Sequence, residues 1–169
     1  MSAYVVLGLG NRIESDEALG SLVIERLERD PSFLAGLPDP ASVELIDGGT
    51  VGLRLLPHLV DLDGLVVVDV IHAGKEPGTF IDLDGESLIR HDQVMSVHDL
   101  GAGELLGALV VMEAWPRRVR VIGLEPKAIE LGLELTMVVA AGVPGLLDAV
   151  TGYLDAWQRE DGAVASPAA

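Results

Sequence analysis

The sequence predicts an α/β protein, a three-layer αβα sandwich around a mostly parallel, twisted sheet of about five strands. Short aliphatic runs with strand character alternate with segments of helical periodicity along the chain. The strand-like runs are apolar at almost every position, which is typical of parallel strands covered on both faces. No internal repeat or linker divides the 169 residues. A chain of this length therefore predicts one domain.

The first half of the chain contains three of the expected strands. The first is a short apolar run, and the next segment repeats Leu19, Val23 and Leu27 at helical spacing behind Ser15 or Asp16 as a helix cap. The third strand is the most apolar of all. The expected elements are, in order, a strand at 4–9, a helix at 16–29, a strand at 42–46, a short helix at 51–59 and a strand at 65–70.

The second half continues the alternation and ends in a long helix. Pro77-Gly78 precedes a shorter strand, and an apolar stripe marks the last helix. Pro144 lies inside that helical pattern, so we expect the helix to kink or to begin anew there. The expected elements are a strand at 79–83, a helix at 96–112, a strand at 119–124 and a helix at 136–157.

Composition excludes several classes of function. The chain has 27 acidic and 11 basic residues, a net charge of -16. This balance argues against binding to nucleic acid or to anionic membranes, which requires clustered Lys and Arg. There is no cysteine, so disulfides, thiolate metal ligands and a cysteine nucleophile are excluded.

The two ends of the chain and its most apolar stretch set further expectations. Residues 137–147 are too few to span a membrane, which takes about 20 residues. The N-terminus has no basic region typical of a signal peptide, so the cytoplasm is the default compartment. Residues 160–169 have the composition of a disordered tail, which leaves 1–159 as the domain.

The loops that follow the strands are where a ligand is expected to bind. In a sheet of this kind, ligands lie beyond the carboxyl ends of the strands, where the strand order reverses. Asp69 interrupts the third strand near this end, and a buried charge there needs a partner. If the first and third strands are neighbours, Asp69 and the loop of Glu17 open onto one crevice. The alternative roles are a loop cap for Asp69 and a helix-dipole or capping role for Glu17.

Four histidines were weighed as further ligands. His98 lies at an expected helix N-terminus, which favours the neutral imidazole that binds metals, although a solvent-facing helix start explains it equally well. His72 follows Asp69 closely and stays a candidate, whereas His58 and His91 are expected at the surface. Two carboxylates and one imidazole could form a site for nickel or zinc.

A nucleotide site is the first alternative. Gly8 and Gly10 follow a strand, but the dinucleotide fingerprint needs a third glycine where Ile13 stands. Asp16 and Glu17 would also repel a phosphate at the start of the helix. The serine-hydrolase motif G-x-S-x-G and the zinc motif H-E-x-x-H do not occur.

Five motifs in order resemble the maturation endopeptidases of nickel–iron hydrogenases, over about residues 4 to 155. They are V-L-G-L-G-N with D-E-A-L-G at 6–20, D-G-G-T at 47–50, the strand of Asp69, S-V-H-D-L-G at 96–101 and I-G-L-E-P at 122–126. The charged run Arg12-Ile13-Glu14-Ser15 departs mildly from the pattern of the family.

This resemblance implies a single αβα domain of phosphorylase/hydrolase-like type. It also implies a peptidase that trims the C-terminal extension from the large-subunit precursor of a hydrogenase after nickel insertion. Glu17, Asp69 and His98 would be its catalytic and metal-recognition residues, with nickel belonging to the precursor and no cofactor tightly bound. The substrate-recognition motif would be Asp47, Gly48, Gly49 and Thr50. A non-catalytic, nickel-dependent chaperone that only binds the precursor is the second alternative.

Overall fold

The computed structural model describes residues 3–89 and 102–165, and a five-stranded sheet lies at its centre. The strand order is β2-β1-β3-β5-β4, in which β4 alone runs antiparallel to its neighbour. The strands are β1 (Tyr4–Leu9), β2 (Val43–Gly49), β3 (Gly64–Val70), β4 (Phe80–Asp84) and β5 (Val119–Leu124). The predicted fold class and the mostly parallel sheet are confirmed, and β1 and β5 have the predicted bounds.

The neighbouring positions of β1 and β3 confirm the arrangement on which the predicted crevice depends. The two strands pair in parallel, with Val6 opposite Val66 and Gly8 opposite Val68. Strand β4 is antiparallel because only the short loop 71–79 connects it to β3. A parallel return would need a crossover connection of a dozen or more residues.

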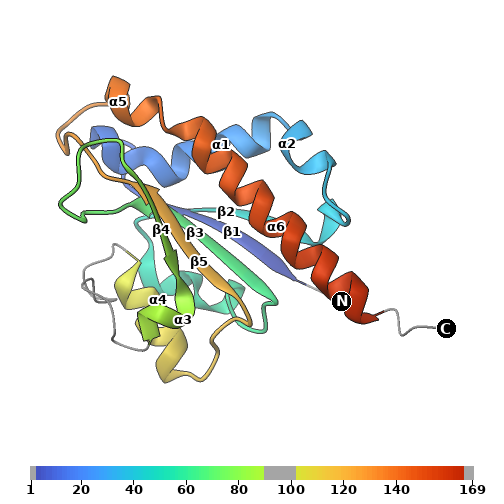
Figure 1. Ribbon diagram of the computed structural model, residues 1–169. Coiled ribbons are helices and arrows are strands. Elements are labelled where there is room, and N and C mark those ends of the chain that lie inside the picture. The colour runs from blue at the N-terminus through green and yellow to red at the C-terminus, as the bar shows by residue number, and fades with distance from the viewer. Residues whose placement is uncertain (1–2, 90–101, 166–169) are drawn as a thin grey trace.

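Helices cover both faces of the sheet, as Figure 1 shows: α1, α2 and α6 lie on one side, and α3 and α4 on the other. The longer helices are α1 (Leu19–Arg29), α4 (Gly103–Val111) and α6 (Val143–Ala165); the shorter ones are α2 (Ser32–Ala35), α3 (Gly85–Ile89) and α5 (Met137–Ala140), with 3-10 turns η1 (Ser15–Ala18), η2 (Pro40–Ser42) and η3 (Gly52–His58). Elements α2, η2 and α3 were not predicted from the sequence, because each is short.

Alternate side chains of the central strands build two separate cores. On one face Val66 and Val68 of β3 pack with Ile24 of α1. On the other face Leu65 and Val67 pack with Leu106 of α4. This alternation follows from the two-residue period of a strand. Because both faces are buried, β3 is apolar at every position before Asp69.

Three expected helices differ in detail. The helix expected at 16–29 begins as the 3-10 turn η1, and the segment at 51–59 is entirely the 3-10 turn η3. The terminal helix divides into α5 and α6, and Pro144 is the second residue of α6, as expected for a proline at a helix start. The helix expected at 96–112 is described from Gly103 onward.

The predicted start of a tail at residue 160 is wrong for residues 160–165, because α6 continues to Ala165. Asp161 is the reason: it accepts hydrogen bonds from Arg118 at 2.6 and 3.0 Å, from Arg117 at 2.9 Å and from the hydroxyl of Tyr4. The Arg118 guanidinium holds the pKa of Asp161 well below its usual range. These contacts fix the last turns of the helix to the sheet.

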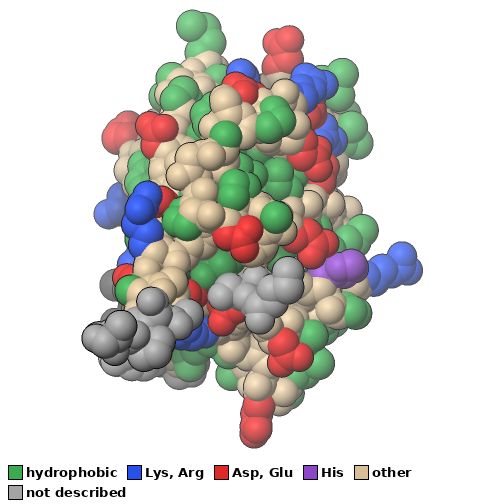
Figure 2. All heavy atoms as spheres, turned by 90° about the vertical axis from the view of Figure 1, so that its right-hand side faces the viewer, with side chains coloured by type: hydrophobic (Ala, Val, Ile, Leu, Met, Phe, Trp, Pro, Cys, Tyr) green, Lys and Arg blue, Asp and Glu red, His purple; other side chains and the backbone are tan. Residues whose placement is uncertain are grey.

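The stretch 137–164 contains an 18-residue window with a mean hydropathy of 1.5, long and apolar enough by length and composition alone to cross a membrane. Within this segment Leu146, Val150 and Leu154 are fully buried in the core, and Asp148 lies exposed on the outer face. We therefore interpret the segment as the helix that covers the sheet. The face drawn in Figure 2 carries scattered carboxylates between apolar side chains, in keeping with the acidic composition.

Candidate active site

The loops that follow β1, β3 and β5 gather at one end of the sheet, at the left of Figure 1. The first of them carries Glu17 and depends on Gly10. The φ angle of Gly10 is +141°, and a Cβ atom there would lie 1.8 Å from the carbonyl oxygen of Glu17. Only glycine permits this close approach. The glycine that suggested a nucleotide loop therefore allows the backbone of Glu17 to fold back over β1.

Glu17 and Asp69 line one cavity of about 260 Å³. Asp69 is only 3% exposed, and within the described residues its carboxylate accepts one hydrogen bond, from the Val70 amide at 2.8 Å. Burial, and then the charge of Glu17, raise the pKa of Asp69 to about 7. The full lining consists of Leu9, Gly10, Glu17, Gly49, Thr50, Gly52, Asp69, Glu104 and Leu105. The prediction that Glu17 and Asp69 face one crevice is thus confirmed.

The pKa of Glu17 is also raised. Burial is the main cause, Glu14 adds to it, and a favourable interaction with His72 opposes it. His72 is exposed and does not line the cavity, so its described role is electrostatic. Two acids whose environment disfavours the charged form are typical of functional sites. A cation placed between them would relieve both penalties.

The motif at 47–50 lies beside this cavity. Gly49 and Thr50 line the cavity itself, and they also line an adjoining hollow together with Asp47 and Gly48. Asp47 is held by hydrogen bonds from Ser21 at 2.6 Å and from Arg12 at 2.8 and 3.2 Å. Burial raises the pKa of Asp47, but the bonds from Ser21 and Arg12 outweigh it and lower that pKa. Asp47 is therefore ionised and fixed in place.

His98 and His91 lie outside the described residues. Among residues 3–89 and 102–165, no group of three His, Asp or Glu side chains is arranged to hold a metal ion. Glu104 lines the cavity with Glu17 and Asp69, and the sequence analysis missed it. No local signal marked it, because Glu104 lies in the middle of the helix expected at 96–112.

The predicted helix cap at Ser15 or Asp16 is wrong. Neither side chain caps η1 or α1. The buried Asp16 instead accepts hydrogen bonds from the amides of Lys127, Ala128 and Thr136, at 2.9, 3.0 and 2.7 Å. Despite its burial, these bonds lower the pKa of Asp16. The side chain ties the loop after β5 to the loop of Glu17.

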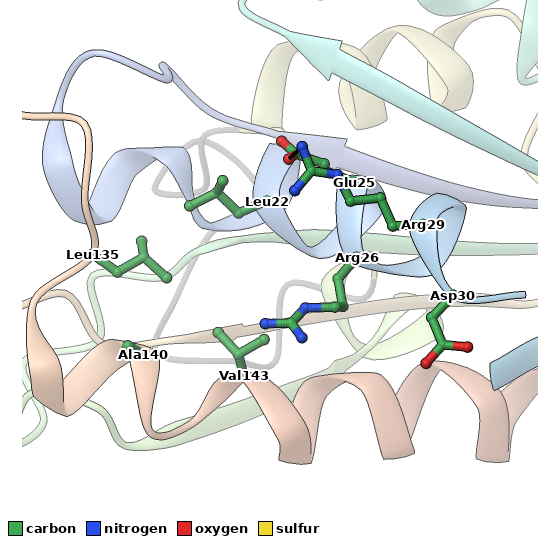
Figure 3. A pocket seen from close by; sticks show the side chains of 8 residues that line it. All are labelled: Leu22, Glu25, Arg26, Arg29, Asp30, Leu135, Ala140 and Val143. Atoms are coloured by element: carbon green, nitrogen blue, oxygen red, sulfur yellow. Dashed lines mark ion pairs between the residues drawn. The ribbon is translucent and has the colours of Figure 1, made fainter. Parts of the chain in front are cut away.

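A larger hollow, of about 490 Å³, lies between α1 and the α5–α6 corner (Figure 3). It contains none of the predicted site residues. Glu25 at its rim is already paired with Arg29 and Arg12, each at 2.5 Å. We take the smaller cavity as the active-site candidate, because it holds the buried acid with a strongly raised pKa.

Comparison with known proteins identifies relatives over nearly the whole chain. The hydrogenase maturation protease family matches residues 22–153, a range that begins after Glu17. The hydrogenase 2 maturation protease of Escherichia coli (strain K12) is 35% identical over 165 residues, covering 96% of this chain and 94% of that protein. The hydrogenase expression/formation protein HupD of Rhodobacter capsulatus is 32% identical over 159 residues, covering 92% of this chain and 73% of that protein.

Solved structures similar to this chain are also hydrogenase maturation peptidases. The hydrogenase maturating endopeptidase HybD from Escherichia coli has a TM-score of 0.76 and 32% identity, and the match covers 95% of this chain and 94% of that chain. The hydrogenase 2 maturation peptidase from a Thaumarchaeota archaeon has a TM-score of 0.65 and 25% identity, covering 90% of this chain and 98% of that chain.

Proposed function

Because this chain belongs to the hydrogenase maturation protease family, we propose that it removes the C-terminal extension from the large-subunit precursor of a nickel–iron hydrogenase. The activity class itself, hydrogenase maturation endopeptidase, follows from the relatives and the solved structures. The precursor, the position of the cut and the dependence on nickel are the proposed parts.

One observation carries the proposal: Glu17 and Asp69 share a cavity in which the pKa of each is raised. Burial disfavours the charged forms of both carboxylates, and a divalent cation would stabilise them. Glu17, Asp69 and His98 would then contact the nickel of the precursor. Two carboxylates and one imidazole suit a borderline divalent metal.

The nickel belongs to the substrate in this proposal. The three residues come from separate loops and include no thiolate, so they would hold free nickel weakly. Nickel already fixed in the precursor by thiolates would instead dock as part of a folded surface. The metal therefore acts as the signal that the precursor is ready to be cut, and no cofactor stays tightly bound to this chain.

Hydrolysis adds water across one peptide bond, which leaves a carboxylate on the new C-terminus and an amine on the released extension. A carboxylate of the Glu17–Asp69 pair takes a proton from the attacking water and returns it to the leaving nitrogen. The pKa of about 7 is that of Asp69 beside Glu17 alone; the nickel of the substrate would lower it and keep the carboxylate in its proton-accepting form. The nickel of the substrate polarises the scissile carbonyl. We assign the catalytic role to Glu17, Asp69 and His98 jointly.

Gly49 and Thr50 support a role for the 47–50 motif in substrate recognition, because both line the cavity. Asp47 would contribute indirectly. It accepts a hydrogen bond from the Gly49 amide at 3.2 Å, which fixes the turn that faces the cavity.

Two other functions were weighed. A nucleotide is disfavoured, because Glu17, Asp69 and Glu104 would all repel phosphates in this cavity. A nickel-dependent chaperone would use the same residues but leave the precursor intact. The intact mass of nickel-loaded precursor after incubation with this protein separates these functions. Loss of one C-terminal fragment supports the peptidase, and an unchanged mass contradicts it. We place the reaction in the cytoplasm.

A further inference from the structure

Large apolar side chains project into solvent beside the candidate active site. Leu131, Leu133 and Met137 are 84%, 75% and 90% exposed. Clusters of this kind, rather than single exposed apolar residues, mark interaction surfaces. We name this surface the apolar shelf; its members are Ile13, Ile129, Leu131, Leu133, Met137 and Val138.

The shelf is one surface although its residues come from the loop after β1, the loop after β5 and the first turn of α5. The Gly132 amide donates to the carbonyl of Ile13 at 3.0 Å, and the Ser15 amide donates to the carbonyl of Gly132 at 3.0 Å. This parallel bridge pairs Glu14 with Gly132 and so sets Ile13 at the register of Leu131 on the other loop. In Figure 1 the blue loop after β1 and the orange loop after β5 lie at the same end of the molecule.

Hydrogen bonds to Asp16 and from Ser15 connect the two loops that carry the shelf. Buried Asp16 binds three amides and the hydroxyl of Thr136 in the second loop. Ser15 adopts a left-handed φ of +48°, and its hydroxyl donates to the Glu130 carbonyl at 2.9 Å. These hydrogen bonds fix the backbones of the two loops relative to each other.

The shelf and the proposed catalytic cavity share the loop after β1. Ile13 and Ser15 belong to the loop of Glu17, which lines that cavity. A polypeptide lying on the shelf therefore contacts the loop that carries Glu17. The same loops are acidic: Glu130 and Glu134 are exposed, Glu14 is half-buried opposite Gly132, and in the second loop only Lys127 offsets them.

We propose that the apolar shelf docks the folded body of the hydrogenase precursor, through an apolar patch bordered by Lys and Arg. This inference rests on the proposed function, because it takes the protein substrate from it. The apolar centre provides affinity, and the charge of these loops provides orientation and association rate. A second copy of this chain is disfavoured, because the carboxylates of the two copies would repel each other. An anionic membrane would be repelled by the same carboxylates.

The test compares two double variants. Leu131→Ser with Leu133→Ser alters the shelf, and Val111→Ser with Met112→Ser alters exposed apolar residues at the far end of α4. We expect the shelf variant to raise the KM for nickel-loaded precursor by roughly tenfold or more with kcat preserved, because truncating residues central to an interface typically costs this much. The α4 variant should match the wild type.

Binding is measured separately, with Asp69→Asn in every protein so that the precursor stays uncut. Weaker binding by the shelf variant, with affinity that falls as salt rises, supports the proposal. Unchanged affinity overturns it, as does a shelf variant that changes only the oligomeric state or only vesicle binding. If the wild type binds the precursor through the shelf but never cuts it, the proposed function fails while the docking surface stands.

Discussion

Asp69 and Glu17 lie in one cavity, where burial and then the charge of Glu17 raise the pKa of the Asp69 carboxyl to about 7. The two residues are 52 positions apart in the chain, and the pairing of β1 with β3 brings their loops together. The geometry is that of two acids that favour a shared proton or an incoming cation.

Removing the charge of Glu17 should lower the pKa of Asp69. Glu17→Gln keeps the size of the side chain but ends the repulsion, so Asp69 should titrate below pH 7. Burial remains, so the pKa of Asp69 should still lie above 3.8, the ordinary value of an aspartate. Carboxyl carbon chemical shifts followed by NMR against pH provide the measurement. Glu14→Gln is the matched control and should leave Asp69 nearly unchanged; an equal effect of both variants would refute the pairing.

Asp69→Asn should change how stability depends on pH. The pKa of Asp69 is raised in the folded protein, so its contribution to stability is fully present below about pH 4 and is lost as pH rises through about 7. The variant lacks this loss. Between pH 4 and 7, the free energy of unfolding of the variant should therefore rise relative to that of the wild type. The difference should reach roughly 4 kcal/mol, at about 1.4 kcal/mol per pKa unit.

Asp47→Asn is the control of opposite sign. Its pKa is lowered in the folded protein, so the wild type gains stability from Asp47 as pH rises from acid. Urea unfolding at a series of pH values gives both comparisons. Parallel curves for Asp69→Asn and the wild type would mean that Asp69 is not a buried acid of raised pKa.

Substitution in the proposed ligand set should abolish processing. Asp69→Asn and His98→Ala should each lower kcat/KM by more than the roughly 10–100-fold typical of disturbing a residue behind the metal ligands. Both proteins should stay folded, as judged by circular dichroism. His58→Ala removes an exposed histidine that lies 3.8 Å from Glu44, and its activity should match the wild type. Full activity of His98→Ala would remove that residue from the site.

Asp16→Asn should loosen the loop after β5. The amide group of asparagine presents a donor where the amides of Lys127, Ala128 and Thr136 need an acceptor. An unsatisfied buried group costs roughly 1–3 kcal/mol. Hydrogen exchange at these three amides should accelerate and stability should fall. Asp148→Asn, exposed on α6, is the control and should change neither; protection that survives Asp16→Asn would contradict this role.

The sheet and the meeting of Glu17 with Asp69 were predictable from the sequence. Aliphatic runs at 4–9 and 119–124 can be buried only as central strands, and they have the predicted bounds. An acid at the end of the most apolar strand must face a crevice, since burial without a partner is costly. Local patterns were sufficient for these features.

Features that depend on distant partners were not predictable. Composition marked residues 160–165 as a tail, but Arg118, 43 positions away, holds Asp161. Asp16 has the sequence position of a helix cap, and its actual partners lie more than 100 positions away. Glu104 enters the cavity because α4 packs against the sheet, which no local spacing reveals.

Cleavage of nickel-loaded and nickel-free precursor by the same enzyme preparation tests the central claim most directly. If Glu17, Asp69 and His98 recognise nickel in the substrate, the loaded precursor is shortened and the nickel-free precursor is not, while the purified enzyme itself carries little metal. Equal cleavage rates on both substrates would contradict this claim, because Glu17, Asp69 and His98 would then not recognise nickel in the substrate.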